Sequence, residues 1–294
     1  MRGALEFRSD TGRNDYRFSL AHAAGDSLIF THEEVQFHRD GYAQPMPPVP
    51  LGPGGHRESG LAELWADQDP TARFAKGFLN RCRVYQFHDT SLESFIRGKA
   101  KVENSTYLMA NGGNLPAFLL KMQQEFPDSY NQIVRTLGLI LPWFDDFALQ
   151  PEGNPRDQDV LLRWRMKGRV DYEFVPGQLS DGSLRIMALV TLLLQPDQRK
   201  PLLIAIDEPE LGLHPSAESI IAGLLKAAAQ TRQVLVATQS VTFLDHFAAE
   251  DIIVVENEDG CSSFTRQCQK TLSAWLDRYT MGEIWQKDLI GGRP

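Results

Sequence analysis

Apolar and polar residues alternate in the first part of the chain and predict antiparallel strands. Tyr16, Phe18 and Leu20 alternate with polar neighbours, and residues 28–37 continue the pattern. A period of two, interrupted by glycine and aspartate turns, is typical of a meander with one buried face. We therefore expect an antiparallel β segment over residues 1–44.

The next hundred residues change from alternation to helical spacing. Residues 45–60 are rich in proline and glycine and predict an irregular loop. Beyond them, apolar residues recur three or four positions apart over 115–122 and 133–140, which indicates amphipathic helices. Asn114, with Pro116 two positions later, is the expected N-cap of the first of these. We expect a loop and helical insertion over 45–150.

The last part of the chain alternates short apolar strands with helices. Helices are expected over 184–194, 216–229 and near 243–247, and strands over 202–206, 234–237 and 252–255. Continuous apolar strands between helices predict a parallel sheet covered on both faces. The predicted class is α/β, a mostly parallel sheet flanked by helices, with its core in residues 151–294.

Polar residues follow two of the predicted strands. Asp207 and Glu208 end the strand 202–206, and Thr238-Gln239-Ser240 ends the strand 234–237. Ligands of open α/β sheets bind at the carboxyl ends of the strands. There Asp207 could hold Mg²⁺ through water and Glu208 could polarise a water molecule. A solvated strand end before a proline turn is the alternative interpretation.

A second candidate site precedes the helix 184–194. Ser180 is a suitable N-cap, and Gly182 would allow a ligand to approach the backbone closely. The free N–H groups of the first turn, with the helix dipole, favour an anion. Ordinary helix capping explains the same residues.

The order of these features resembles a known family. A serine-capped helix, a strand ending in Asp-Glu and a strand ending in Thr-Gln-Ser follow one another as in the heads of ABC-type ATPases. Further stretches look like the RecF-like and OLD-like AAA-type ATPases related to SMC proteins: 84–91, 112–118, 144–147, 208–215, 282–285 and 291–294. The resemblance covers most of the chain and implies a single P-loop NTPase head of the ABC-ATPase type over residues 1–294.

The resemblance also implies roles for individual residues. Asp207 matches the Walker B aspartate that holds Mg²⁺, Glu208 matches the catalytic glutamate, and Gln239 occupies the switch position. The matches to the signature motif, which binds the nucleotide of the opposite subunit, are Ser180, Asp181, Gly182 and Ser183. The matches to the D-loop at the dimer contact are Leu211, Gly212 and His214. Gln86 is a weak candidate for the Q-loop glutamine.

One motif of the family is not found. A Walker A loop, G-x-x-x-x-G-K-[ST], wraps the phosphates of the nucleotide. Gly98-Lys99 is followed by Ala100, and the loop 52–59 carries His56-Arg57 where Gly-Lys is required. We expect a shortened reading frame or a degenerate ATPase, either of which would bind ATP poorly on its own. An unconventional Walker A loop is the alternative.

Composition and charge limit the partners and the cellular compartment that we expect for this protein. A formal net charge of −8 and a pI of about 5.4 argue against a broadly basic surface, so DNA is expected only by resemblance. Three cysteines without a CxxC pair, scattered histidines and no long apolar run predict a cytoplasmic protein with no membrane span and no structural metal.

The function expected from the sequence is that of a RecF-like ATPase head that uses ATP and Mg²⁺. Nucleotide-gated dimerisation, as a homodimer or with a full-length ATPase partner, would drive work on DNA or on another protein. The alternative is a non-catalytic subunit that supplies the signature motif in trans to a complete ATPase. A nuclease is disfavoured because no second acidic cluster follows Asp251.

Overall fold

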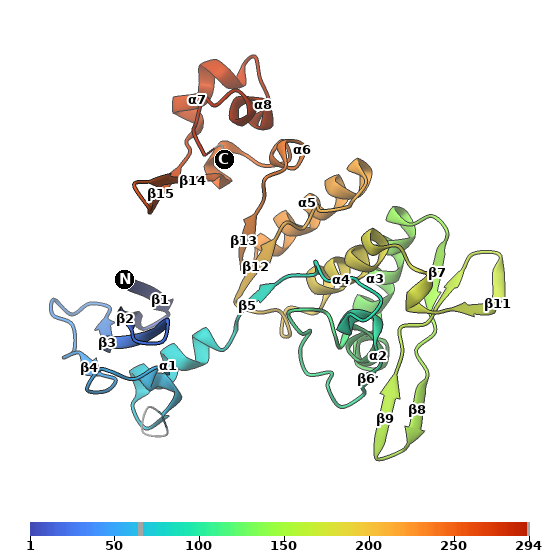
Figure 1. Cartoon of the computed structure of the whole chain (residues 1–294), viewed down its shortest axis with the longest axis horizontal. Coiled ribbons are helices and arrows are strands. Elements are labelled where there is room, and N and C mark those ends of the chain that lie inside the picture. Colours follow the sequence, from blue (N-terminus) through green and yellow to red (C-terminus); the bar gives the residue numbers. More distant parts are fainter. Residues whose placement is uncertain (64–66, 293–294) are drawn as a thin grey trace. The chain divides into compact units, whose positions relative to one another are not determined.

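The chain divides into two compact units, Met1–Cys82 and Arg83–Pro294, called here the N-terminal and C-terminal units (Figure 1). The computed structural model describes residues 1–63 and 67–292. The boundaries expected from the sequence at residues 44 and 150 stay a prediction.

The N-terminal unit is built on an antiparallel sheet, as the alternating pattern predicts. Its strands follow one another in chain order: β1 (Arg2–Ser9), β2 (Gly12–Ala23), β3 (Ser27–Arg39) and β4 (Val49–Pro50). Tyr16 of β2 faces Val35 of β3, and both side chains are buried. The helix α1 (Pro70–Leu79) packs on this face, with its first turn capped by Asp69.

A buried glutamate ties the sheet to the loop that follows it. Glu33 of β3 is 1% exposed. Its carboxylate accepts hydrogen bonds from the hydroxyl groups of Tyr16 (2.6 Å) and Ser59 (2.5 Å) and from the backbone N–H of Gly60 (2.8 Å). Both oxygens are therefore satisfied, and Gly60 begins the short 3-10 helix η1 (Gly60–Ala62) at this point.

Four helices pack in succession to form the main core of the C-terminal unit (Figure 1). They are α2 (Leu115–Glu125), α3 (Pro127–Ile140), α4 (Asp181–Leu194) and α5 (Pro215–Ala229). α4 is buried almost all round, which explains its nearly continuous apolar sequence. Asn114 precedes α2 as expected, but its side chain makes no cap: it accepts from Met109 N–H (2.8 Å) instead.

The expected parallel pairing is confirmed for two strands. β12 (Leu203–Asp207) pairs in parallel with β13 (Gln233–Ala237), and β5 (Cys82–Tyr85) lies on the other side of β12. Asp207 is level with Ala237, so the polar residues after both strands meet at one edge. Ile204 and Ile206 of β12 are buried.

The prediction of a mostly parallel sheet needs correction. The strand expected over 252–255 is β14 (Ile253–Glu258), which forms an antiparallel hairpin with β15 (Cys261–Arg266). Asp259 and Gly260 have φ angles of 50° and 80°, the left-handed conformation that a tight hairpin turn requires. The strand therefore pairs with the segment that follows it and does not join β12 and β13 in the parallel sheet.

The remaining strands form two further antiparallel sheets. One has the order β11 (Arg169–Phe174), β10 (Trp164–Met166), β7 (Phe144–Phe147), and the other the order β6 (Ala100–Lys101), β9 (Asp157–Val160), β8 (Pro151–Asn154). The last helices, α6 (Val241–Leu244), α7 (Gln269–Leu276) and α8 (Met281–Gln286), end the described chain. A small apolar cluster centred on Ile284 joins α7 and α8 to β14.

Candidate active site

The carboxyl end of β12 brings together side chains that are distant in sequence. The amide Nε2 of Gln86 donates to Oδ2 of Asp207 (3.2 Å), across 121 positions of the chain. His88 Nε2 lies 3.1 Å from the backbone oxygen of Asp207, and Gln86 Nε2 lies 3.3 Å from His88 Nδ1. Gln86 and His88 follow β5, the neighbour of β12, so the sheet order itself creates this meeting point.

Glu208 stands next to this meeting point in an unusual backbone conformation. Its φ is 40°, in the left-handed region that costs a non-glycine residue about 1 kcal/mol. Its N–H donates to the carbonyl of Ala237 (2.8 Å), which extends the β12–β13 ladder by one residue. The Glu208 carboxylate is half-buried and makes no hydrogen bond to any residue that the structure describes. It is therefore available to bind water.

A second carboxylate in the same loop, Glu210, was not singled out from the sequence. It is 9% exposed, and Thr238 donates to its Oε1 (2.5 Å), whereas Oε2 is buried without a partner in the described chain. Burial, with the nearby carboxylates of Glu208 and Glu218, raises the pKa of Glu210, although the Thr238 hydroxyl acts in the opposite direction. The Glu-Pro-Glu spacing after an apolar strand was the available signal.

The first turn of α4 has the form that the sequence predicts. Ser180 Oγ accepts from the N–H of Ser183 (3.1 Å), and the two hydroxyl groups lie 2.8 Å apart. The backbone N–H groups of Asp181 and Gly182 donate to no residue that the structure describes. With 14 residues behind them, these free groups carry the positive end of a long helix dipole.

The glycine of this turn has a packing role. A Cβ atom on Gly182 would lie 2.5 Å from the carbonyl oxygen of Gly212, so no side chain fits there. Gly212 itself has a φ of 76°, which favours glycine. The two glycines therefore let the loop after β12 approach the start of α4.

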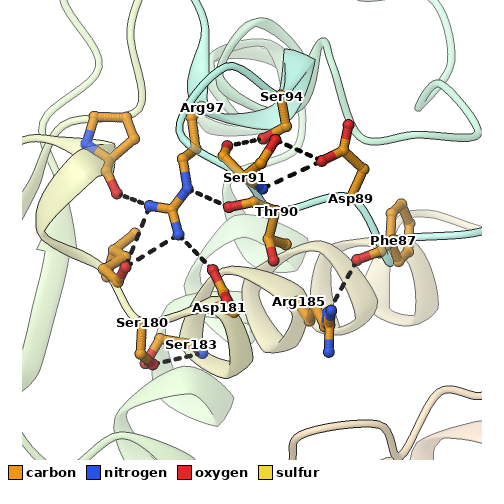
Figure 2. Close-up of polar contacts among 12 residues, drawn as sticks. Phe87, Asp89, Thr90, Ser91, Ser94, Arg97, Ser180, Asp181, Ser183 and Arg185 are labelled. Carbon is orange, nitrogen blue, oxygen red and sulfur yellow. Dashed lines mark hydrogen bonds and ion pairs between the residues drawn. The ribbon is translucent and has the colours of Figure 1, made fainter.

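Arg185 of α4 connects the same loop to the residues after β5. Its guanidinium donates to the carbonyls of Phe87 (3.1 Å), His88 (2.8 Å) and Leu211 (3.0 Å). Figure 2 shows the contact with Phe87. One side chain thus holds α4 against both segments that border Asp207. No local pattern in the sequence predicts this role for Arg185.

The other predicted site residues lie at the surface. Gln239 follows β13 at the edge where Asp207 ends β12, and its exposed side chain makes no hydrogen bond within the described chain. Leu211 is 42% exposed. His214 caps α5, with Nδ1 accepting from the N–H of Ser216 (3.3 Å).

The donor set fits a metal ion that arrives with a phosphate group. Among residues 1–63 and 67–292, no three His, Cys, Asp or Glu side chains gather to hold a metal. Mg²⁺ usually takes one or two carboxylates and completes its shell with waters and phosphate oxygens. Asp207, with its carboxylate at the open edge of the sheet, suits that role.

The two Walker A-like stretches have other surroundings. Gly98 ends the 3-10 helix η3 (Phe95–Arg97), and Lys99 pairs with Glu152 (2.7 Å). The loop 52–59 packs against β3 in the N-terminal unit, where the N–H of Gly55 donates to Phe30 (2.6 Å). Neither stretch leads directly into an α-helix.

Heads of SMC proteins are among the solved structures similar to this chain. A SmcHead bound to the C-winged helix domain of ScpA has 14% identity and a TM-score of 0.50, over 90% of this chain and 76% of that chain. An Smc head from Pyrococcus furiosus has 12% identity and a TM-score of 0.43, over 90% and 79%. A structure described under "ATP-driven dimerization and DNA stimulated activation of SMC ATPases" has 16% identity and a TM-score of 0.41, over 54% and 94%.

No curated protein matches the sequence. None of the described helices has the length and apolar character to cross a bilayer.

Residues 80–245, more than half of the chain, match the family described as "AAA domain, putative AbiEii toxin, Type IV TA system". This segment contains the Gln86–Asp207 contact, Glu208 and the whole of α4. The likeness to the SmcHead adds the fold, which is similar to that of an SMC head. The chain therefore belongs to this family of AAA ATPase domains.

Proposed function

We propose that this chain is an ATP-hydrolysing head of the RecF-like type, related to SMC heads, that works as a dimer. The observation that carries the proposal is the contact between Gln86 and Asp207 at the end of β12, beside the unpaired carboxylate of Glu208. An amide and two carboxylates at one sheet edge are suited to a nucleotide phosphate, its cation and an attacking water.

Each residue has a distinct task in this proposal. Asp207 would hold Mg²⁺, which when bound bridges phosphate oxygens and offsets their charge. Glu208 would accept a hydrogen bond from the attacking water and orient it. Gln86 and Gln239 would donate amide hydrogen bonds, because a glutamine side chain carries no titratable proton.

The start of α4 would serve the nucleotide of a second subunit. The free N–H groups of Asp181 and Gly182 and the hydroxyl groups of Ser180 and Ser183 are suited to a γ-phosphate. Leu211, Gly212 and His214 would contact the partner, and the exposure of Leu211 is consistent with this. Dimerisation driven by ATP and activation by DNA are described for SMC ATPases. We extend both to this chain as proposals, with DNA or a partner protein as the target.

A second candidate function is a non-catalytic subunit that supplies Ser180–Ser183 in trans to a complete ATPase. One observation favours it: Lys99, the single lysine that follows a glycine, is paired with Glu152 rather than placed at a helix start. The start of α4, by contrast, is held in place within the C-terminal unit by the hydrogen bonds of Arg185 to Phe87, His88 and Leu211.

The first experiment measures ATP hydrolysis by the wild type and by Asp207→Asn and Glu208→Gln. If Glu208 orients the water, Glu208→Gln lowers kcat at least about 100-fold. Glu173→Gln is the matched control, because Glu173 lies on β11 and makes no hydrogen bond within the described chain. Equal rates for Glu208→Gln and Glu173→Gln would reject the assignment.

The second experiment mixes the chain with a homologue that contains G-x-x-x-x-G-K-[ST]. Supply of the α4 turn in trans predicts that the homologue's hydrolysis rises and that Ser180→Arg abolishes the rise. Ser273→Arg on the exposed face of α7 is the control. Absence of stimulation by homologues of this kind would count against the second candidate.

A further inference from the structure

Arg97 is a buried cation that links two segments of the C-terminal unit. Its side chain is 6% exposed. Nε donates to the carbonyl of Thr90 (2.7 Å), Nη1 to Leu179 (3.2 Å) and to Pro176, and Nη2 to Oδ1 of Asp181 (2.8 Å). Figure 2 shows the guanidinium between the turn 89–97 and the start of α4.

The turn that carries Arg97 is itself held by hydrogen bonds. Ser91 Oγ donates to Asp89 (2.7 Å), and Ser94 Oγ donates to the carbonyl of Ser91 (2.5 Å). The 3-10 helix η3 then begins at Phe95. The guanidinium is thus presented by an ordered turn.

Asp181 poses an electrostatic problem at this place. It is the first residue of α4 and lies between Ser180 and Gly182, where the free N–H groups are. A carboxylate there stabilises the helix, but its charge repels any phosphate that approaches the same groups. The Thr90 hydroxyl and the Arg97 guanidinium lower the pKa of Asp181, so the carboxylate is charged at neutral pH.

We propose that Arg97 is a positioning residue for the phosphate site at the start of α4. It pairs with Asp181 and holds that carboxylate on the side of the turn 89–97, as Figure 2 shows. The N–H groups of Asp181 and Gly182 then stay accessible, and the local charge is balanced. Arg97 acts through Asp181 and does not touch the phosphate. The inference rests on the proposed function, because it assumes that α4 receives a phosphate.

The test uses inorganic phosphate as the probe, with NMR chemical shifts of the Gly182 and Ser183 amides as the readout at constant ionic strength. Arg97→Gln removes the cation that pairs with Asp181 and keeps the Thr90 hydroxyl, and we expect phosphate to bind about tenfold more weakly. Asp181→Asn removes the repulsion, so binding stays equal or tightens. The double variant has neither charge, and we expect binding within about twofold of the wild type.

The double variant separates positioning from a structural role. If Arg97 served only to hold the carbonyls of Pro176 and Leu179, Asp181→Asn would not rescue Arg97→Gln, and the proposal would be overturned. Lys99→Gln is the matched control, since it removes a nearby exposed cation that pairs with Glu152, and phosphate binding should not change. Should Arg97→Gln not fold, Arg97→Lys keeps the positive charge beside Asp181 but loses guanidinium hydrogen bonds to the carbonyls of Thr90 and Leu179. Positioning through charge then predicts phosphate binding close to that of the wild type, whereas a purely structural role predicts a loss that Asp181→Asn does not restore.

Failure of this inference is distinct from failure of the proposed function. Amides that do not respond to phosphate in the wild type would overturn the role of Arg97 and leave the hydrolysis test of Glu208 as it stands. The reverse result, an Arg97-dependent phosphate response with hydrolysis insensitive to Glu208→Gln, would support the inference and reject only the hydrolytic assignment.

Discussion

Two buried glutamates, one in each unit of the chain, have opposite surroundings. Glu33 in the N-terminal sheet has both carboxylate oxygens satisfied by three donors. Glu210 in the loop after β12 has one donor, Thr238, and one oxygen without a partner in the described chain. A buried carboxylate with full partners stabilises a fold, whereas one with partial partners costs free energy. The costly arrangement lies beside the proposed catalytic residues.

The largest effect is expected for Glu33→Ala. The substitution removes the carboxylate that accepts from the hydroxyl groups of Tyr16 and Ser59 and from the buried N–H of Gly60, and leaves only a long 3.5 Å contact between the two hydroxyl groups. We expect the free energy of unfolding of the N-terminal unit to fall by about 3–5 kcal/mol. Urea unfolding measures it, with Glu33→Gln as the milder variant that keeps one oxygen. A loss within the scatter of the method would remove the contrast between the two glutamates.

A smaller effect of opposite sign is expected for Glu210→Gln. The neutral amide removes a buried charge and keeps an oxygen for Thr238, so we expect about 1 kcal/mol of added stability at neutral pH.

The pH dependence of this gain has a definite sign. Because folding raises the pKa of Glu210, the folded state binds the proton more tightly than the unfolded state. The wild type then loses stability as the pH rises from the ordinary carboxyl range through the raised pKa. Thermal melts should show that the difference in melting temperature between Glu210→Gln and the wild type disappears as the pH falls. A difference in melting temperature that increases as the pH falls would contradict the prediction.

The smallest effect is expected for the exposed Glu152→Gln, which serves as a reference for both buried groups. Hydrogen bonds from Lys99 and Arg163 lower the pKa of Glu152. Its contribution is therefore present above the ordinary carboxyl pKa and lost as the pH falls through the lowered value, the reverse of Glu210. Solvent and salt weaken such exposed pairs, so the change in melting temperature should vanish at high salt. A loss of stability as large as that of Glu33→Ala would mean that burial of a glutamate does not determine how much it contributes to stability.

Local signals predicted the elements and most of the proposed site residues. The cap at Ser180, the strand ending in Asp207-Glu208 and the meander over the first strands depend on neighbours in sequence, and the structure contains them. The order of these signals also predicted an ATPase head related to SMC proteins, and the matches to an AAA domain family and to the fold of an SMC head agree with it.

Contacts that depend on distant backbone groups could not be predicted. Arg185 binds carbonyls of Phe87 and His88 that lie 98 and 97 positions away, and every residue type offers a carbonyl. Arg97 reaches the carbonyl of Leu179 across 82 positions in the same way, beside its ion pair with Asp181. Asn114 is the opposite case. Its pattern predicts a bond to the first turn of α2, but its side-chain oxygen accepts from the N–H of Met109 in the preceding loop. The Asp259-Gly260 turn, by contrast, is a local signal, because an Asp-Gly pair between two strands is typical of a hairpin.

The backbone at Glu208 has a consequence for how this position can change. A residue with a φ of 40° is strained unless it is glycine or, to a lesser degree, asparagine. Selection for a more stable fold would therefore favour Gly or Asn at position 208, at the expense of the carboxylate. Stability and the proposed chemistry compete at this residue, so libraries screened only for thermal tolerance should lose Glu208 early and keep Glu33.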